Sequence, residues 1–237
     1  MTTKSRPIIM SSDSVRAILE NRKTQTRRVM KPQPTIGKEG YYSDFSPYPD
    51  STAYWYERAE IDKDGEMYPG KKVFGVSSED GEEGHVCHFG APGDRLWVRE
   101  AWKIVTSIEK TWCSYKADFQ EHTLAEMAQR CKNFGNGTGW KSPMFMPRKY
   151  SRLTLEITNV RCERVQEITT ADIEQEGFVR LDTTGNSYVD IAGMQHMFSE
   201  FAEIWDKLNG KRKGCTWEDN PFTWVIEFKK IEGGDNE

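Results

Sequence analysis

The sequence lacks the features that mark membrane and secreted proteins. No apolar run approaches the roughly 18 residues that a membrane-spanning helix needs, and the first ten residues contain no apolar core of a signal peptide. The five cysteines are scattered and odd in number, which is typical of reduced thiols. We therefore expect a cytoplasmic protein with no membrane partner; the sequence leaves the oligomeric state open.

The common catalytic and cofactor signatures are missing as well. There is no P-loop, no G-x-G-x-x-G, no H-E-x-x-H and no serine-hydrolase or kinase motif. With only four histidines, a Ser-His-Asp triad is disfavoured. The one metal-like cluster, His85-Val86-Cys87-His88, has no second pair at suitable spacing, so we interpret it as loop residues rather than a zinc site. We expect no metal and no cofactor, and any catalysis would use lysine, threonine and carboxylates.

Aliphatic residues are scarce and aromatic residues abundant. Hydrophobic residues make up 36% of the 237 residues and aromatic residues 12%, which favours a small barrel core with broad loops over a helical bundle. The length fits one large domain or a small domain with a long insertion. Because the chain is acidic, with a net charge of −4, nonspecific coating of nucleic acid is disfavoured.

Against this acidic background, residues 21–28 (NRKTQTRR) form a concentrated basic motif. Residues 1–31 hold eight basic and two acidic residues, a net charge of +6, so the remainder of the chain carries −10. A local reversal of sign suggests a site for one anionic ligand. A solvated basic turn is an equally good interpretation of charge alone.

The motif follows a predicted helix. Ser11 or Ser12 can cap a helix that carries Val15, Ile18 and Leu19 on one face. Asn21 tolerates the left-handed conformation that ends a helix, so Lys23 would lie at the helix exit. In an extended segment, alternation then puts three residues on one side and two on the other: Thr24, Thr26 and Arg28 against Gln25 and Arg27.

Alternating and helical patterns predict the other elements. Strands are expected over Pro7–Met10, Lys72–Val76, Arg95–Trp102, Thr111–Ala117, Arg152–Arg161 and Phe222–Ile231. Helices are expected over Ile168–Gly177 and along the apolar stripe from Met197 to Leu208. We expect a single domain over 1–231, interrupted by a loop-rich insertion at 31–90, and a flexible tail at 232–237. The insertion's aromatic residues either pin the loop or stack bases.

Several segments together carry a resemblance to the ASCH domain family. Its signature is Gly-x-Lys-x-x-x-x-Arg, which Lys23 and Arg28 match, with Asn21 in the place of the glycine. Further segments resemble conserved parts of larger, phage-associated ASCH-like proteins: Gly93–Glu100, Phe201–Gly210 and Asn220–Phe228. The resemblance implies an α+β fold, a PUA-like β-barrel flanked by a few helices, with the long insertion after the signature.

The resemblance also implies three candidate functions. The first is binding of RNA or a modified nucleoside in a Lys/Thr/Arg/Glu pocket. The second is an amidohydrolase that deacylates N4-acetylcytidine, with Lys23, Thr26 and Glu176 as catalytic residues. The third is a ribonuclease, metal-independent or metal-assisted. The expected ligand-binding residues are Arg22, Thr24, Arg27, Arg28, Trp97 and Arg99.

Each candidate catalytic residue also has a structural interpretation. Lys23 can act as a base only if its pKa is depressed, which burial and the neighbouring arginines would favour. Otherwise Lys23 forms a structural ion pair with Glu176. Thr26 is equally well interpreted as a strand hydroxyl, Glu176 as a solvated carboxylate at a helix end, and Trp97 as a core residue rather than a pocket wall.

Overall fold

The computed structural model describes most of the chain, in seven stretches: residues 3–34, 47–48, 52–78, 84–106, 110–119, 139–179 and 187–231. The tail predicted at 232–237 and two of the insertion's aromatic residues, Tyr41 and Tyr42, lie outside these stretches.

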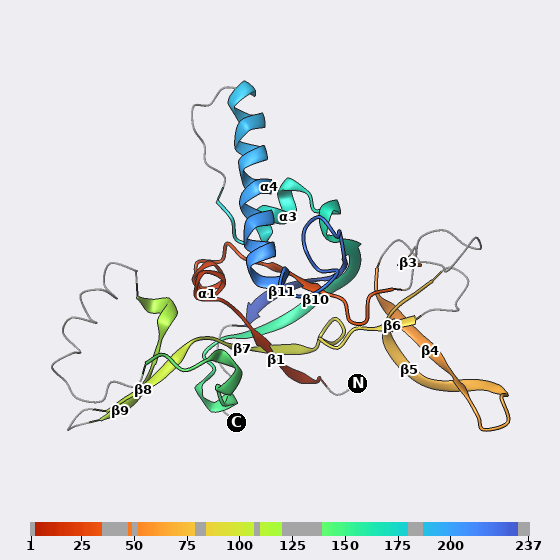
Figure 1. The fold of residues 1–237 in the computed structure, drawn as a ribbon. Coiled ribbons are helices and arrows are strands. Elements are labelled where there is room, and N and C mark those ends of the chain that lie inside the picture. The colour runs from red at the N-terminus through yellow and green to blue at the C-terminus, as the bar shows by residue number, and fades with distance from the viewer. Residues whose placement is uncertain are drawn as a thin grey trace.

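A five-stranded mixed sheet forms the centre of the molecule, in the order β1-β7-β10-β11-β2 (Figure 1). The strands are β1 (Ser5–Ile9), β2 (Gln25–Val29), β7 (Arg95–Arg99), β10 (Thr154–Arg164) and β11 (Phe222–Ile231). β1 pairs with β7 in parallel, and every other neighbour is antiparallel. The sequence predicted strands at four of these places and an extended segment at β2, and the bounds of β11 match the prediction.

The sheet is open along its strand pairings, so the coarse α+β class is confirmed whereas a closed barrel is not seen among the described residues. A side chain instead bridges its two edges. The Arg28 guanidinium, on edge strand β2, donates a hydrogen bond of 2.6 Å to the Ile9 carbonyl of edge strand β1. The same nitrogen lies 3.3 Å from the Met10 sulfur. The edges are therefore joined by a cation rather than by a backbone ladder.

The insertion contains a second sheet, so it is more regular than the predicted loop-rich segment. Its strands are β3 (Pro47–Tyr48), β4 (Tyr54–Ile61), β5 (Met67–Ser78) and β6 (Gly84–Val86), with β5 pairing all three others. Prolines, glycines and charged residues obscured this pairing in the sequence. The Ala53 amide donates to the Val160 carbonyl at a β-bulge of β10, and Phe74 and Val76 join the main core. The insertion is thereby packed onto the central sheet.

A third, two-stranded sheet extends from the opposite side of the molecule. It consists of β8 (Trp102–Thr106) and β9 (Thr111–Tyr115), which pair antiparallel. Figure 1 shows this hairpin and the β4–β5 hairpin as two wings that point in opposite directions from the central sheet.

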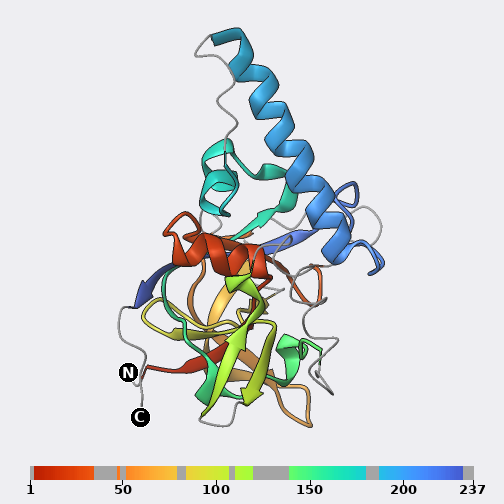
Figure 2. The same cartoon turned by 90° about the vertical axis from the view of Figure 1, so that its left-hand side faces the viewer.

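The helices pack against different faces of the sheet. They are α1 (Ser12–Leu19), α3 (Thr170–Gln175) and α4 (Ser187–Asn209), with short 3₁₀ turns η1 (Lys116–Asp118), η2 (Pro143–Phe145), η3 (Arg148–Tyr150) and η4 (Val165–Glu167). The N-terminal half of α4 extends well beyond the sheet (Figure 2). Within the described part of the chain, none of the helices is both long and apolar enough to cross a membrane.

Two apolar clusters lie on opposite faces of β10 and β11. Leu155, Ile157, Trp224 and Ile226 belong to the larger cluster, which also takes in β1, α1 and the insertion. The smaller cluster joins α3 and α4 and includes Trp205. Strand alternation produces this division, because neighbouring residues of β11 point to opposite faces. Polar side chains between the two clusters are therefore held by packing on both sides.

Candidate functional site

The basic motif begins where α1 ends in a left-handed turn. Asn21 has φ of 58°, and its amide donates to the Ile18 carbonyl. The Arg22 amide reaches back to the Ala17 carbonyl at 2.8 Å, which completes a Schellman motif. This turn, as predicted for Asn21, places Lys23 at the helix exit.

Helix α3 ends in the same way at a glycine. Gly177 has φ of 97°, and its amide donates to the Glu174 carbonyl while the Phe178 amide donates to the Ile173 carbonyl. A β-carbon at Gly177 would lie 3.1 Å from the β-carbon of Lys23. Glycine is therefore needed both for the backbone angle and for the close approach of the two helix ends.

The two helix ends bring Lys23 and Glu176 into contact. The Lys23 ammonium donates to the Glu176 carboxylate at 2.5 Å and to the Glu176 backbone carbonyl at 2.8 Å. The two side chains are only 4% and 7% exposed. Glu176 Oε1, the second carboxylate oxygen, is buried and has no hydrogen-bond partner in the described structure. The contact therefore leaves one buried acceptor available.

The pKa of Lys23 is lowered from its ordinary value. Burial is the largest cause, because removal from water disfavours the ammonium, and the charges of Arg28 and Arg27 lower the pKa further. The Glu176 carboxylate opposes the shift but does not cancel it. Burial and neighbouring arginines were expected from the sequence to favour such a shift, and the structure supplies both. A lysine in this environment can release and take up a proton more readily than one in water.

Lys23 borders a surface pocket of about 290 Å³. Its lining comes from the end of α1, the start of the basic motif and the end of β11: Ile18, Asn21, Lys23, Thr24, Phe228, Lys229 and Lys230. All three charged lining residues are lysines, although the chain as a whole is acidic. The pocket is therefore suited to an anionic or electron-rich ligand.

Thr26 and Arg28 lie on the opposite side of β2 from Arg27, as alternation predicted. Thr26 pairs with Ile226 and Arg28 with Trp224, so both face the larger apolar cluster. Thr26 is only 4% exposed, and in the described structure its hydroxyl makes no hydrogen bond to Lys23 or Glu176. The structure thus brings together two of the three predicted catalytic residues.

Arg28 is held between the two sheet edges by its hydrogen bond to the Ile9 carbonyl. Its charge nevertheless acts on the Lys23–Glu176 pair. Burial lowers the pKa of Arg28, and the negative charge of Glu176 partly opposes this shift. Its Nε is buried without a partner in the described structure.

Arg27 points into a buried ionic network instead of a pocket. Its guanidinium is 1% exposed and lies 2.8 Å from Glu163 and 3.3 Å from Asp172. Arg161 contacts the same two carboxylates and also Glu227. The geometry gives Arg27 a structural role between β2, β10 and α3 rather than the predicted ligand contact.

The remaining predicted ligand residues fall in different places. Arg22 donates to the Gly177 carbonyl and pairs with Glu20, so it fastens the two helix ends together. Thr24 lines the pocket, and its backbone links the Gln175 carbonyl to the Phe228 amide.

Trp97 and Arg99 are not part of the pocket lining. The Arg99 guanidinium lies 4.6 Å from the centre of the Trp97 ring and donates to the Met144 carbonyl. Both point away from the larger cluster, which takes Leu96 and Val98 from the same strand. The contact between Arg99 and Trp97 is therefore a local one, on the face of β7 that points away from the larger cluster.

Sequence reasoning missed three pocket residues. Phe228, Lys229 and Lys230 lie at the end of β11, some two hundred residues from the motif they face. The sequence indicated these residues only as part of an alternating strand, and alternation does not show which strands pair with it. No group of three or more potential metal ligands occurs among the described residues, and Cys87, Cys113, Cys162 and Cys215 are free thiols.

The buried ionic network around Arg27 and Asp172 predicts that the free energy of unfolding falls at acidic pH. Burial alone would raise the pKa of Asp172, but hydrogen bonds from Thr169 and the charge of Arg27 outweigh it and lower the pKa from 3.8 to about 2. Because the folded state holds this proton less tightly than the unfolded state, ionised Asp172 stabilises the fold above its ordinary pKa. We expect roughly 2 kcal/mol of this stability to disappear as the pH falls from about 4 to about 2.

Urea unfolding of the protein and of Asp172→Asn at several acidic pH values tests this. The free-energy difference between the two should shrink across that interval. A difference that stays constant down to the lowest pH would show that Asp172 does not titrate as described.

Comparisons with models of protein families, with curated proteins and with solved structures find no match to this chain. Any functional conclusion therefore depends on the site itself and on the sequence motif.

Proposed function

We propose that the pocket beside Lys23 binds a nucleoside unit, either free or within RNA. The observation that carries the proposal is the buried Lys23–Glu176 pair at the edge of a pocket whose charged residues are all lysines. The ASCH-like signature, Lys23 with Arg28, supports the same conclusion from the sequence.

The pocket chemistry suits the parts of a nucleotide. Asn21 and Thr24 offer an amide and a hydroxyl, which can hydrogen-bond to a base edge. Lys230 offers positive charge for a phosphate, whereas Lys229 is paired with Glu156 at 2.8 Å. At about 290 Å³, the pocket is at the small end of the range for ligand sites, which suits a nucleoside better than a larger cofactor.

A second candidate is hydrolysis of an N4-acylated cytidine. It is favoured by the lowered pKa of Lys23 and by the Glu176 carboxylate within hydrogen-bonding distance. Amide hydrolysis needs proton transfer to the leaving amine, and a lysine with a depressed pKa next to a carboxylate can supply it. In this proposal Thr26 would supply the nucleophile or position water, which requires its hydroxyl to approach the pair when substrate binds.

Calorimetric titration with cytidine, N4-acetylcytidine and cytidine 5′-monophosphate tests the binding proposal. Lys230→Gln should weaken binding of the monophosphate by about fivefold and binding of cytidine much less, since one partly exposed charge contact is worth up to about 1 kcal/mol. Lys72→Gln, on the distant strand β5, is the matched control and should change neither. Absence of binding by folded protein for all three ligands would reject the proposal.

Chromatography of the same mixtures tests the hydrolysis candidate. Release of cytidine from N4-acetylcytidine that is abolished in Glu176→Gln would establish an amidohydrolase and place Glu176 in its site. Binding of the acetylated nucleoside without release would leave a binding module as the function. Scission of an RNA strand under the same conditions would identify the ribonuclease activity instead.

A further inference from the structure

One face of the β8–β9 hairpin combines aromatic rings with lysines. The strand register places Val105 opposite Trp112 and Lys103 opposite Ser114, so these four side chains share a face. The Lys103 ammonium also lies 4.5 Å from the ring centre of Trp140, which follows later in the chain. We call this surface the β8–β9 face; it comprises Lys103, Val105, Lys110, Trp112, Ser114 and Trp140.

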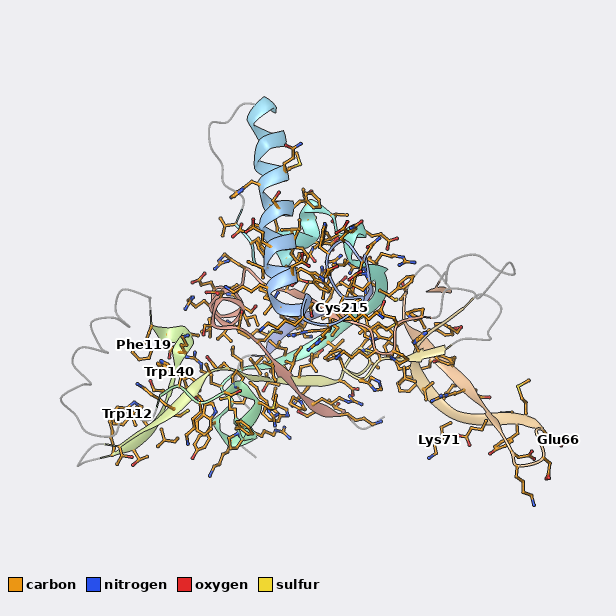
Figure 3. The ribbon with its side chains drawn as sticks, viewed as in Figure 1. Glu66, Lys71, Trp112, Phe119, Trp140 and Cys215 are labelled. Carbon is orange, nitrogen blue, oxygen red and sulfur yellow. The ribbon has the colours of Figure 1, made fainter. Side chains whose placement is uncertain are left out.

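The aromatic rings of the β8–β9 face are partly exposed to solvent. Trp112 is 41% exposed, and the Lys110 ammonium lies 5.5 Å from its ring centre. Trp140 is half-buried against Phe119, with ring centres 5.5 Å apart. Figure 3 shows these three aromatic side chains on the same wing. Phe119 supports Trp140, while Trp112 stands outside the core.

The charge of this wing has the opposite sign to that of the whole chain. Residues 102–106, 110–119 and 139–150 contain six basic residues and one acidic residue, a net charge of +5. The β4–β5 wing, residues 52–78, contains four basic and five acidic residues, a net charge of −1. It exposes a tryptophan to the same extent, Trp55 at 41%. Exposed rings occur on both wings, but of the two only the β8–β9 wing combines them with positive charge.

We propose that the β8–β9 face binds single-stranded nucleic acid. Bases would stack on Trp112 and Trp140, while the lysines contact the phosphates between them. Stacking on aromatic rings within a positively charged surface is how proteins bind single strands without sequence preference. A duplex is a poorer ligand, because its bases are already stacked on one another.

This site is separate from the pocket beside Lys23. None of the pocket residues belongs to the β8–β9 face, and the proposal does not depend on nucleoside binding. If both are correct, the face would hold the strand from which the pocket takes a nucleoside.

Fluorescence anisotropy with labelled strands of about 12 nucleotides tests the proposal on the full chain. We expect oligouridine or oligothymidine to bind, and Trp112→Ala to weaken the binding about tenfold because one base can no longer stack. Trp55→Ala, with equal exposure on the other wing, is the matched control and should leave the affinity unchanged. Equal effects in both variants, or no effect in either, would overturn the proposal.

Salt dependence provides a second, independent measurement. The double variant Lys103→Gln with Lys110→Gln should reduce the slope of log affinity against log salt by about 0.7 for each phosphate that the protein no longer neutralises. Lys71→Gln with Lys72→Gln on β5 is the control. An unchanged slope in the first pair, or duplex binding as tight as single-strand binding, would reject this face as the site.

Two further measurements separate the ligands and the sites. The ratio of oligouridine to oligothymidine affinity identifies whether RNA or DNA is the preferred strand. Lys230→Gln should weaken strand binding less than Trp112→Ala does, because Lys230 belongs to the pocket and not to the β8–β9 face. Strand binding that is abolished in Lys230→Gln and retained in Trp112→Ala would assign the strand to the pocket and overturn the proposal.

Discussion

Replacement of Lys23 by methionine is expected to lower the free energy of unfolding by about 3–5 kcal/mol. The change removes the ammonium but leaves Glu176 buried, with neither carboxylate oxygen paired. An unpaired buried charge costs far more than the pair contributes when both partners are present. Urea unfolding of the single variant measures the decrease.

The double variant Lys23→Met with Glu176→Leu separates the two contributions. Because it removes both charges, it should be more stable than Lys23→Met alone. If the double variant is also at least as stable as the unaltered protein, the ion pair is retained for a reason other than stability, which is what a binding or catalytic role requires. A decrease below about 1 kcal/mol in the single variant would instead mean that water reaches Glu176.

Replacement of Arg27 by methionine is expected to cost about 3 kcal/mol, the lower end of the range for a broken buried pair. Arg27 is almost fully buried and contacts Glu163 and Asp172, but Arg161 contacts the same carboxylates and limits the damage. Urea unfolding midpoints measure the effect.

The matched control lies in the same motif. Arg22→Met removes a basic residue that is exposed, so it should cost less than about 1 kcal/mol. Similar decreases in stability for the two variants would contradict the division of this motif into a buried structural arginine and a surface one.

Local features of the site were predictable from the sequence, because they depend on near neighbours. The left-handed turn at Asn21 follows from residue type, and the opposite orientation of Arg27 and Arg28 follows from strand alternation. The contact between Lys23 and Glu176 was expected, either as a structural ion pair or as part of a catalytic site, and the structure shows the contact itself.

Features that depend on long-range pairing were not predictable. The lysines of the pocket come from β11, whose neighbours are fixed by packing on both faces of the sheet. Arg28 bridges the two sheet edges because β1 and β2 lie close together, and no local sequence pattern indicates this distance. Of the insertion's sheet only the strand over Lys72–Val76 was predicted, because proline, glycine and many charges weaken the alternating signal elsewhere.

The place of β11 in the sheet has a consequence for biosynthesis. β11 is the last strand of the described chain, yet it lies between β10 and β2, and β2 comes far earlier in the chain. While a ribosome still holds β11, its two neighbours have no strand to join them, and the pocket lacks Phe228, Lys229 and Lys230. A nascent chain is therefore unable to form this pocket until β11 has left the ribosome.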